Sequence, residues 1–437
     1  MKHRLFVLVI AAALAMNVLP PLAAGGSAAR GSPTGDEKIT LNVMHFHTIE
    51  TMENSSESKG YHAMKDKFIK EHPNVTINET IFQQTDYHTK IMALAAADEM
   101  PDIFFTKGSW VQNFYDNNLM ANITSYVDEG VYRGGIFIPF TRGGKVYGIP
   151  IQFMPTSLVY YNAKLFNEIG MDHFPKTWDE LVQADKAFKA KGIATIALGN
   201  KDKWPYESCI ISTLGDRFTG TGWTLSIILN DGKAKFTDNE FISTLRYSQQ
   251  MASMFNKDFN AINNEQSTVL YGSGKAASTV EGGWSISFQL QNSDPDVLAN
   301  TRLAVLPAVP GMKGDTNATS GGGGWAQSAS AKLTGTRLQA AMDFIKQTTG
   351  VEYSQFLMDD TGLPGPCEVP IKDKGSLSKL SQDYLDYMGS LKFVPIYDIQ
   401  MDGAVIDVMN SKLQELLGGT ASPEEVAAAI QAEQNKL

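Results

Sequence analysis

The stretch that decides the fold is Gly144-Lys145-Val146-Tyr147-Gly148-Ile149-Pro150, followed by Ser157-Leu158-Val159-Tyr160-Tyr161-Asn162 and then Pro175-Lys176-Thr177-Trp178-Asp179-Glu180-Leu181. This order predicts a turn, a short strand, a crossing segment, a second strand and a helix. Thr177 is placed to cap the helix, and Glu180, three residues on, can accept from the N–H of the cap itself. The spacing therefore fixes where the helix begins.

A strand–helix–strand unit is predicted near the start of the folded chain. Residues 39–43 and 75–77 alternate apolar and polar side chains, as half-buried strands do. Tyr61, Met64 and Phe68 mark one face of a helix between them. Because strands and helices go on alternating along the chain, we expect an α/β fold with largely parallel sheets.

Two further helices carry start signals. We expect one capping box at Thr237 and Glu240, opening a helix over residues 238–256, and another at Ser422 and Glu425. In both pairs the acid follows the hydroxyl residue by three positions.

Composition sets the broad class of protein. The 437 residues are 43% hydrophobic and 19% charged, which are globular values, and the length allows two or three domains. The formal net charge is −10, and no cluster of Lys and Arg is present. A nucleic-acid binder would carry a basic patch, so nucleic acid is not an expected partner.

The N-terminus is predicted to be a targeting segment. Lys2 and Arg4 precede an apolar run, and small residues follow, so we expect a signal peptide over 1–24 and a flexible linker over 25–37. Gly25 stands where a lipoprotein signal would carry the acylated cysteine. We therefore expect an exported protein, periplasmic or associated with the cell envelope, without a lipid anchor.

Motifs for catalysis, metals and cofactors are missing from the sequence. It has neither a nucleophile elbow nor a zinc-binding His-Glu-x-x-His, and residues 272–275 lack the earlier glycine and the Ser/Thr of a phosphate loop. No catalytic residue, metal or cofactor is therefore predicted. Cys209 and Cys367 are expected to be isolated, partly buried thiols rather than a disulfide.

His45 and His47 form the one notable histidine pair. They lie near the carboxyl end of the first predicted strand, where open α/β sheets bind ligands. We expect His45 to satisfy a backbone carbonyl in the core and His47 to hydrogen-bond a ligand.

Aromatic residues in loops point to a sugar. Trp284 follows two glycines and Trp325 follows four, while Trp204 begins a Trp-Pro-Tyr segment that ends at Tyr206. Sugars present apolar C–H faces and hydroxyl edges, so proteins hold them on aromatic platforms with a few polar groups. Each ring could equally pack as local core.

The order of these motifs resembles the extracellular solute-binding proteins of carbohydrate ABC importers, the family that includes maltose-binding protein. The resemblance implies a two-lobed, type II-like periplasmic-binding-protein fold with the ligand between the lobes. It also implies that Trp284 stacks on sugar. Candidate contacts under this resemblance are His47, Asp102, Phe105, Trp110, Trp204, Tyr206, Trp284 and Trp325.

The same resemblance supplies an expected division of the chain. Glycine- and proline-rich segments at 148–155, 314–324 and 361–370 become crossings between lobes. One lobe is expected to hold 38–150 and 321–362, and the other 151–320 and the C-terminal 363–437.

Two departures from the family pattern remove charged sugar-binding groups. Residues 106–109 read Thr-Lys-Gly-Ser and residues 152–155 read Gln-Phe-Met-Pro. Maltodextrin specificity is therefore not carried over. We expect a monomeric, non-catalytic binding protein that delivers a carbohydrate to membrane permease subunits. The alternatives are a secreted carbohydrate-active enzyme and the same fold binding a charged solute such as a polyamine or phosphate ester.

Overall fold

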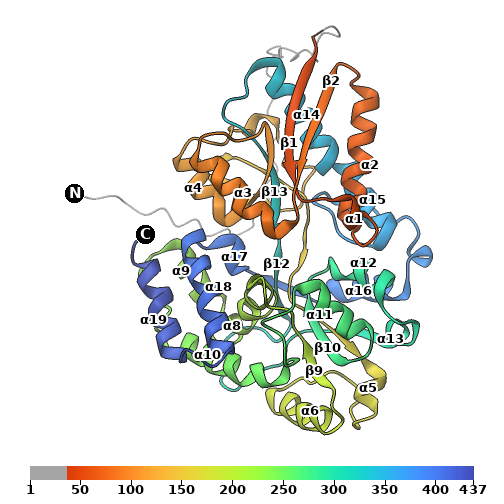
Figure 1. The fold of residues 1–437 in the computed structure, drawn as a ribbon, viewed down its shortest axis with the longest axis vertical. Coiled ribbons are helices and arrows are strands. Elements are labelled where there is room, and N and C mark those ends of the chain that lie inside the picture. Colours follow the sequence, from red (N-terminus) through yellow and green to blue (C-terminus); the bar gives the residue numbers. More distant parts are fainter. Residues whose placement is uncertain (1–36) are drawn as a thin grey trace, which may run out of the picture.

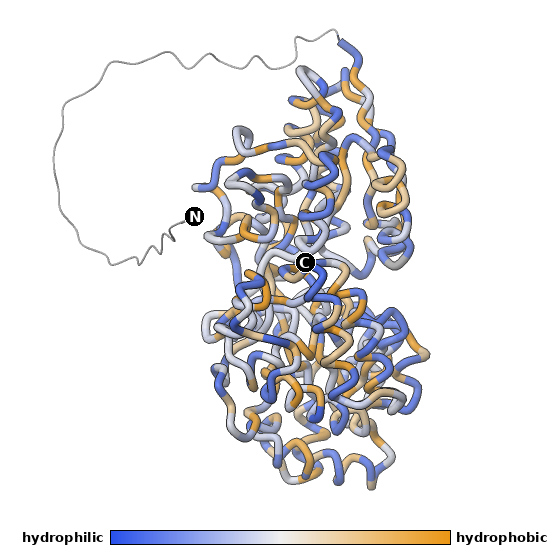
Figure 2. Tube along the Cα trace, turned by 90° about the vertical axis from the view of Figure 1, so that its left-hand side faces the viewer, coloured by the Kyte–Doolittle hydropathy of each residue, from blue (hydrophilic) through white to orange (hydrophobic). Residues whose placement is uncertain are grey.

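Two α/β lobes stacked one above the other make up the molecule (Figure 1). The computed structural model describes residues 37–437. The predictions of a signal peptide, of a linker and of a missing lipid-attachment cysteine at Gly25 lie outside the described residues. The side view shows the same two stacked bodies (Figure 2).

The upper lobe is built on a five-stranded sheet. Its order is β2 (Val75–Ile81), β1 (Ile39–His45), β3 (Ile103–Lys107), β13 (Trp325–Ala329) and β6 (Ile149–Pro150). β1 is parallel to both β2 and β3, whereas β13 is antiparallel to β3 and β6. The apolar core around this sheet includes Val43, Phe104 and Phe344.

The lower lobe has a four-stranded sheet in the order β11 (Thr301–Ala304), β8 (Leu158–Asn162), β10 (Ala276–Glu281), β9 (Ala194–Ala197). Only β10 and β9 are parallel. Both sheets are thus mixed. β8 and β13 are the strands that follow a crossing between the lobes, and each runs antiparallel to its neighbours.

A small third sheet lies between the lobes. It contains β14 (Lys392–Val394), β12 (Ala318–Gly322) and β7 (Met154–Pro155). β7 and β12 fall within two of the glycine- and proline-rich segments, and they pair antiparallel. These strands connect the upper and lower sheets.

Helices cover both sheets. α14 (Gly335–Thr349) and α15 (Val351–Thr361) pack on α2 (Ser56–Glu71) in the upper lobe, while α18 (Gly403–Leu417) packs on α19 (Pro423–Gln434) in the lower lobe. The other elements are α1 (Ile49–Met52), α3 (Gln84–Ala96), η1 (Gly108–Trp110), α4 (Val111–Asp116), η2 (Thr124–Tyr126), η3 (Ile138–Phe140), β4 (Thr141–Arg142), β5 (Lys145–Val146), α5 (Ala163–Asn167), α6 (Trp178–Ala190), α7 (Trp204–Tyr206), η4 (Glu207–Ile211), α8 (Ser212–Thr219), α9 (Thr221–Leu229), α10 (Asn239–Met251), η5 (Ala252–Met254), α11 (Asn264–Gly272), α12 (Ser285–Asn292), α13 (Pro295–Asn300), η6 (Lys374–Ser376), α16 (Lys379–Met388) and α17 (Tyr397–Gln400).

The capping predictions have two outcomes. Both halves of the box are present at Thr177 and at Ser422. The box predicted at Thr237 is wrong, because α10 is capped by Asp238. The carboxylate of Asp238 accepts the indole N–H of Trp223 at 2.9 Å and the backbone N–H of Lys235, so it faces away from the helix.

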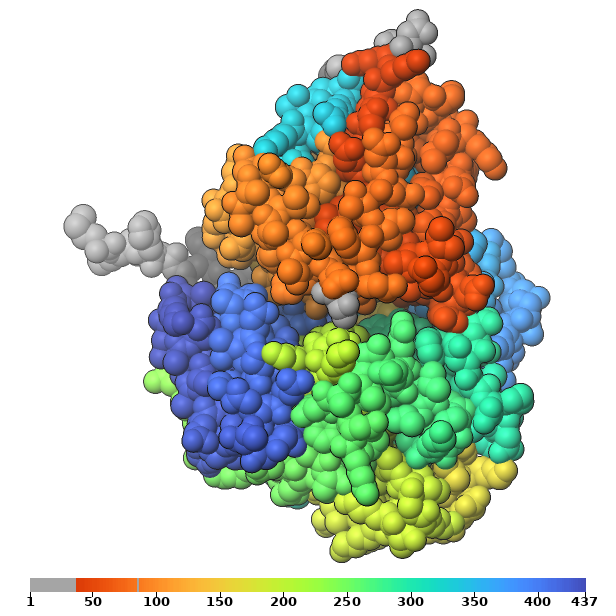
Figure 3. Space-filling view, in the orientation of Figure 1, coloured from red at the N-terminus to blue at the C-terminus, as the bar shows by residue number. Residues whose placement is uncertain are grey.

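The lobes share apolar and polar contacts. Tyr353 and Leu357 of α15 join Tyr160 of β8 and Tyr384 of α16 in one buried cluster. Asn292 Nδ2 donates to Asn54 Oδ1 at 3.0 Å across the same flank. The space-filling view shows the lobes meeting along a seam across the molecule (Figure 3). Among residues 37–437, no helix combines the length and the apolar character needed to cross a bilayer.

Candidate functional site

The carboxyl end of the upper sheet faces the seam. β1 ends at His45 and β3 ends at Lys107, and Trp325 of β13 lies opposite Lys107 in the antiparallel register. Since ligands of α/β sheets bind at the carboxyl ends of parallel strands, this edge is the expected wall of the site.

An aromatic cluster fills that edge. Trp325 contacts Phe46 and Trp110 edge to face, with ring centroids 4.7 and 5.2 Å apart. The Lys107 ammonium lies 5.2 Å from the centroid of the Trp325 ring, a cation–π arrangement. Trp325 and Trp110 are each only 7% exposed and Phe105 is fully buried. Trp325 and Trp110 pack on each other, whereas Phe105 packs on Phe46 and His47, with ring centroids 5.1 and 5.2 Å apart.

The histidine pair forms a buried hydrogen-bonded chain. His47 donates its backbone N–H to His45 Nδ1 at 3.1 Å, so His45 carries its proton on Nε2 and donates it to Glu79 Oε1 at 2.9 Å. The predicted partner of His45 was a backbone carbonyl; the structure shows a carboxylate instead. His47 Nδ1 lies 2.9 Å from Ser58 Oγ. Burial lowers the pKa of His47 well below its ordinary value, so its ring is neutral at pH 7.

The lower wall presents two tryptophans. The rings of Trp204 and Trp284 are inclined at 63° with centroids 6.1 Å apart, and both are partly exposed. Trp284 follows β10 after two glycines, and its indole N–H donates to Glu281 Oε2 at 3.0 Å. Two of the residues expected to contact the ligand, Trp204 and Trp284, thus lie side by side, and their contact with a ligand stays a prediction.

An ion pair crosses the seam beside the upper cluster. Lys107 Nζ lies 2.9 Å from Asp398 Oδ2 of α17. Glu207 lies in the same buried group: burial first, and then the charge of Asp398, hold the pKa of Glu207 well above its usual range. The backbone of α17 is also close, since a Cβ on Gly108 would meet the carbonyl oxygen of Ile399.

Two of the predicted contacts lie elsewhere. Asp102 comes directly before β3, whereas Lys107 ends it, so Asp102 lies at the opposite end of the strand. Its carboxylate accepts from Arg337 at 2.6 Å and from the backbone N–H of Asn42 at 2.8 Å. Tyr206 is fully buried in the lower core, 6.0 Å from the Phe255 ring. We leave both out of the site.

Sequence reasoning missed Lys107, Asp398 and the role of Glu281. A signal for Lys107 existed: it is a charged residue at the carboxyl end of a predicted strand. Asp398 comes from a four-residue helix that no pattern marked.

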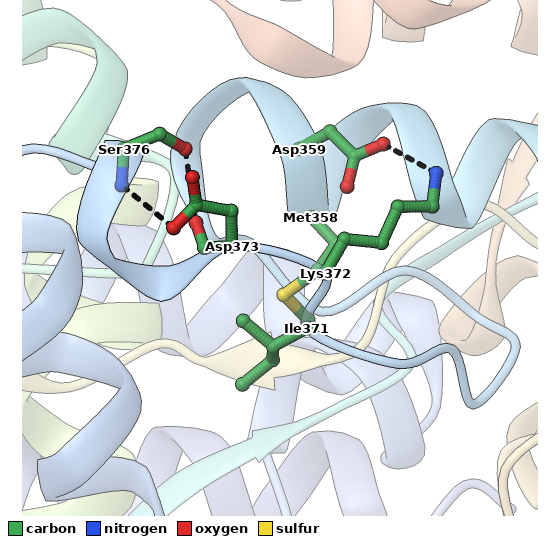
Figure 4. Close-up of a pocket in the computed structure, with 6 residues that line it drawn as sticks. All are labelled: Met358, Asp359, Ile371, Lys372, Asp373 and Ser376. Atoms are coloured by element: carbon green, nitrogen blue, oxygen red, sulfur yellow. Dashed lines mark hydrogen bonds and ion pairs between the residues drawn. The ribbon is translucent and has the colours of Figure 1, made fainter.

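The molecule also has a pocket of about 150 Å³ lined by Met358, Asp359, Ile371, Lys372, Asp373 and Ser376 (Figure 4). Its charged groups are paired: Lys372 Nζ donates to Asp359 Oδ2 at 2.8 Å, and Asp373 accepts from the backbone N–H of Ser376. No aromatic residue lines it, and we assign it no role. Among residues 37–437 no cluster of three or more His, Cys, Asp or Glu side chains could hold a metal ion. Cys209 and Cys367 are buried free thiols.

A family model for bacterial extracellular solute-binding proteins matches residues 54–351. The chain belongs to this family. The melibiose/raffinose/stachyose-binding protein MelE of Bacillus subtilis is 24% identical over 451 residues, covering 100% of this chain and 97% of MelE. The multiple sugar-binding protein of Streptococcus mutans is 23% identical and the match covers 81% of each chain. The match to an uncharacterized ABC transporter extracellular-binding protein of Pyrococcus horikoshii covers 65% of each chain.

Solved structures share the fold. A chitin oligosaccharide binding protein superposes with a TM-score of 0.82 at 24% identity, covering 92% of this chain and 99% of that one. A protein described in work on xylan utilization by the thermophilic bacterium Caldanaerobius polysaccharolyticus has a TM-score of 0.79 at 28% identity, covering 90% and 99%. The predicted two-lobed α/β fold and the predicted family are thereby confirmed.

Proposed function

We propose that this solute-binding protein binds an oligosaccharide between its lobes and delivers it to the permease of an ABC importer. The observation that carries the proposal is the corner of Trp204 and Trp284, whose rings lie 6.1 Å apart, are partly exposed and belong to the lower wall. Two inclined aromatic rings fit the apolar face of a sugar. The sugar-binding names of two relatives support the same ligand class.

An uncharged ligand fits the electrostatics of the seam. Lys107 is paired with Asp398, and His47 is neutral. A strongly charged solute would need a protein charge of opposite sign that is unpaired before binding. A buried unpaired charge is energetically unfavourable in the unliganded protein. We therefore favour a neutral sugar over a polyamine or phosphate ester. His47, Trp110 and Trp325 remain predicted contacts.

We further infer a monomeric, exported and non-catalytic protein. Ligand that bridges both lobes binds their closed arrangement better, and that difference in affinity shifts the population toward closure. The closed form would then be the one that docks on the permease.

A thermal-shift screen of the purified protein tests the proposal. The panel contains chito-, xylo- and malto-oligosaccharides and the raffinose series, with a polyamine and a sugar phosphate as charged controls. A sugar at 100 times its dissociation constant adds about 2.7 kcal/mol to the free energy of unfolding. We expect one neutral class to raise Tm with no breakdown of the sugar by chromatography. Steady sugar release that stops in Glu281→Gln would instead support a carbohydrate-active enzyme.

Substitution of the aromatic corner locates the site. Trp284→Ala should weaken binding of the sugar found in the screen by roughly 1–3 kcal/mol, the range known for bases stacked on aromatic rings. The matched control is Trp223→Ala, whose ring stacks on Phe241 at 5.2 Å in the lower core. Equal affinity in wild type and Trp284→Ala would remove this ring from the site.

A further inference from the structure

The carboxylate of Glu281 lies at the nitrogen edge of the Trp284 ring. It is the last residue of β10 and is only 2% exposed. Oε2 accepts the Trp284 indole N–H at 3.0 Å and Asn264 Nδ2 at 3.2 Å, and Oε1 lies 3.5 Å from Thr268 Oγ1. Asn264 and Thr268 both belong to α11. The side chain therefore ties the indole to a strand and to a helix at once.

Gly282 determines where the ring lies. A Cβ at this position would come within 2.1 Å of Trp284 Cζ3, so the ring is folded directly over the glycine backbone. The missing side chain permits the close approach, and Glu281 holds the nitrogen edge. The ring is thus fixed on one face and one edge, while the residue remains partly exposed.

Glu281 is an unusual choice for a structural acceptor. The neighbours that hydrogen-bond to it are neutral, and the titratable groups facing it are the Cys209 thiol and the Tyr160 hydroxyl. Burial raises the pKa of Glu281 to about 7, against the opposing effect of the hydrogen bonds from Asn264, Trp284 and Thr268. A glutamine or a backbone carbonyl could accept the same N–H without a buried charge, so the acid makes this hydrogen bond sensitive to pH near neutrality.

We propose that Glu281 is a positioning residue for ligand binding, because its carboxylate fixes the orientation of the Trp284 ring on which the ligand packs. That the ligand packs on the Trp284 ring rests on the proposed function. The anchoring itself is a property of the unliganded protein. It can be measured without knowing the sugar.

The test is the indole N–H resonance of Trp284 in ¹H–¹⁵N spectra of the full protein. The chain has six tryptophans, so the resonance lost in Trp284→Phe identifies the right one. In wild type we expect a downfield resonance that moves further downfield as pH rises, with a midpoint near 7, since the ionised carboxylate is the stronger acceptor. Glu281→Gln keeps an acceptor oxygen, so its resonance should stay downfield but should not titrate.

Glu281→Leu removes the acceptor and supplies the decisive contrast. Its indole resonance should move upfield, and acrylamide should quench the tryptophan fluorescence more than in Glu281→Gln. A resonance in Glu281→Leu identical to wild type, or one that titrates equally in Glu281→Gln, would overturn the proposal. If the resonances behave as expected but no sugar in the screen binds, the proposed function fails and the anchoring stands.

Discussion

Replacing Lys107 by methionine tests the charge arrangement at the seam. The substitution keeps most of the apolar stem and removes the ammonium that lies 2.9 Å from Asp398 Oδ2. The Asp398 side chain is only 4% exposed, so water replaces the lost partner poorly. Glu207 is fully buried in the same group, but its raised pKa favours the neutral acid, so Asp398 is the charged partner of the ammonium. The variant therefore leaves the buried Asp398 carboxylate without its cation.

The size of the effect follows from the same geometry. Two unit charges at 2.9 Å attract by about 6 kcal/mol at an effective dielectric constant of 20. Desolvation offsets part of this attraction, and removing one partner of a buried pair typically destabilises by about 3–5 kcal/mol. The Lys107 side chain is 18% exposed, which places the expected loss at the lower end of this range, about 3 kcal/mol.

Denaturant unfolding at pH 7, followed by tryptophan fluorescence, measures this loss. Lys107→Met/Asp398→Asn should recover much of the loss, because the double variant buries no uncompensated charge. Lys164→Met is the matched control: it breaks an exposed pair with Asp296 and should change stability by less than about 1 kcal/mol. Equal stability of wild type and Lys107→Met, or a double variant no better than the single one, would refute the reasoning.

Three other predictions concern local features. Gly282→Ala should destabilise the fold by about 1–3 kcal/mol and change the fluorescence of Trp284, because a Cβ would lie 2.1 Å from that ring. The control is Gly222→Ala in α9, where a Cβ would have no other atom within 4 Å, so it should be neutral or stabilising. Thr177→Ala and Ser422→Ala should each lose about 1 kcal/mol in urea unfolding, since each removes half of a capping box. The pKa of Glu281 rises from its ordinary 4.5 to about 7 on folding, so between these values the folded state binds one more proton than the unfolded state. The free energy of unfolding should therefore fall by up to about 3 kcal/mol as pH rises through this window. Glu281→Gln should abolish this pH dependence.

Local signals in the sequence were reliable where one residue had one plausible role. Thr177 and Ser422 each precede a glutamate by three positions, and both form the predicted box. The same spacing misled at Thr237, because Asp238 next to it competes for the cap position and is itself engaged by Trp223. Spacing alone does not predict when a side chain near the cap will be hydrogen-bonded by another part of the chain, as Asp238 is by Trp223.

The direction of a strand explains the main failures in the site. Asp102 and Lys107 flank the same strand, β3, but only the residue at its carboxyl end faces the seam. The aromatic motifs were more informative, because glycines beside Trp284 allow the ring a close approach to backbone that few other positions offer. Tyr206 belonged to a similar motif, yet it points into the core, since residues two apart on a helix point to different sides.

Glu281 and Glu207 are the acids beside the aromatic segments, so a carbohydrate-active enzyme would have to use them, and both have other partners. Glu281 accepts the indole N–H of Trp284, and Glu207 lies with Ser212 and Asp398 beside the lobe-spanning lysine. A catalytic acid and base must reach the substrate, whereas these two carboxyls are buried and bonded to groups of the protein itself. Under the proposals above, Glu281 holds the Trp284 ring in place, and Glu207 lies beside the Lys107–Asp398 pair as a neutral acid. These hydrogen-bond partners are therefore what favours the proposed binding role over the carbohydrate-active alternative, since both roles would place acids beside an aromatic corner.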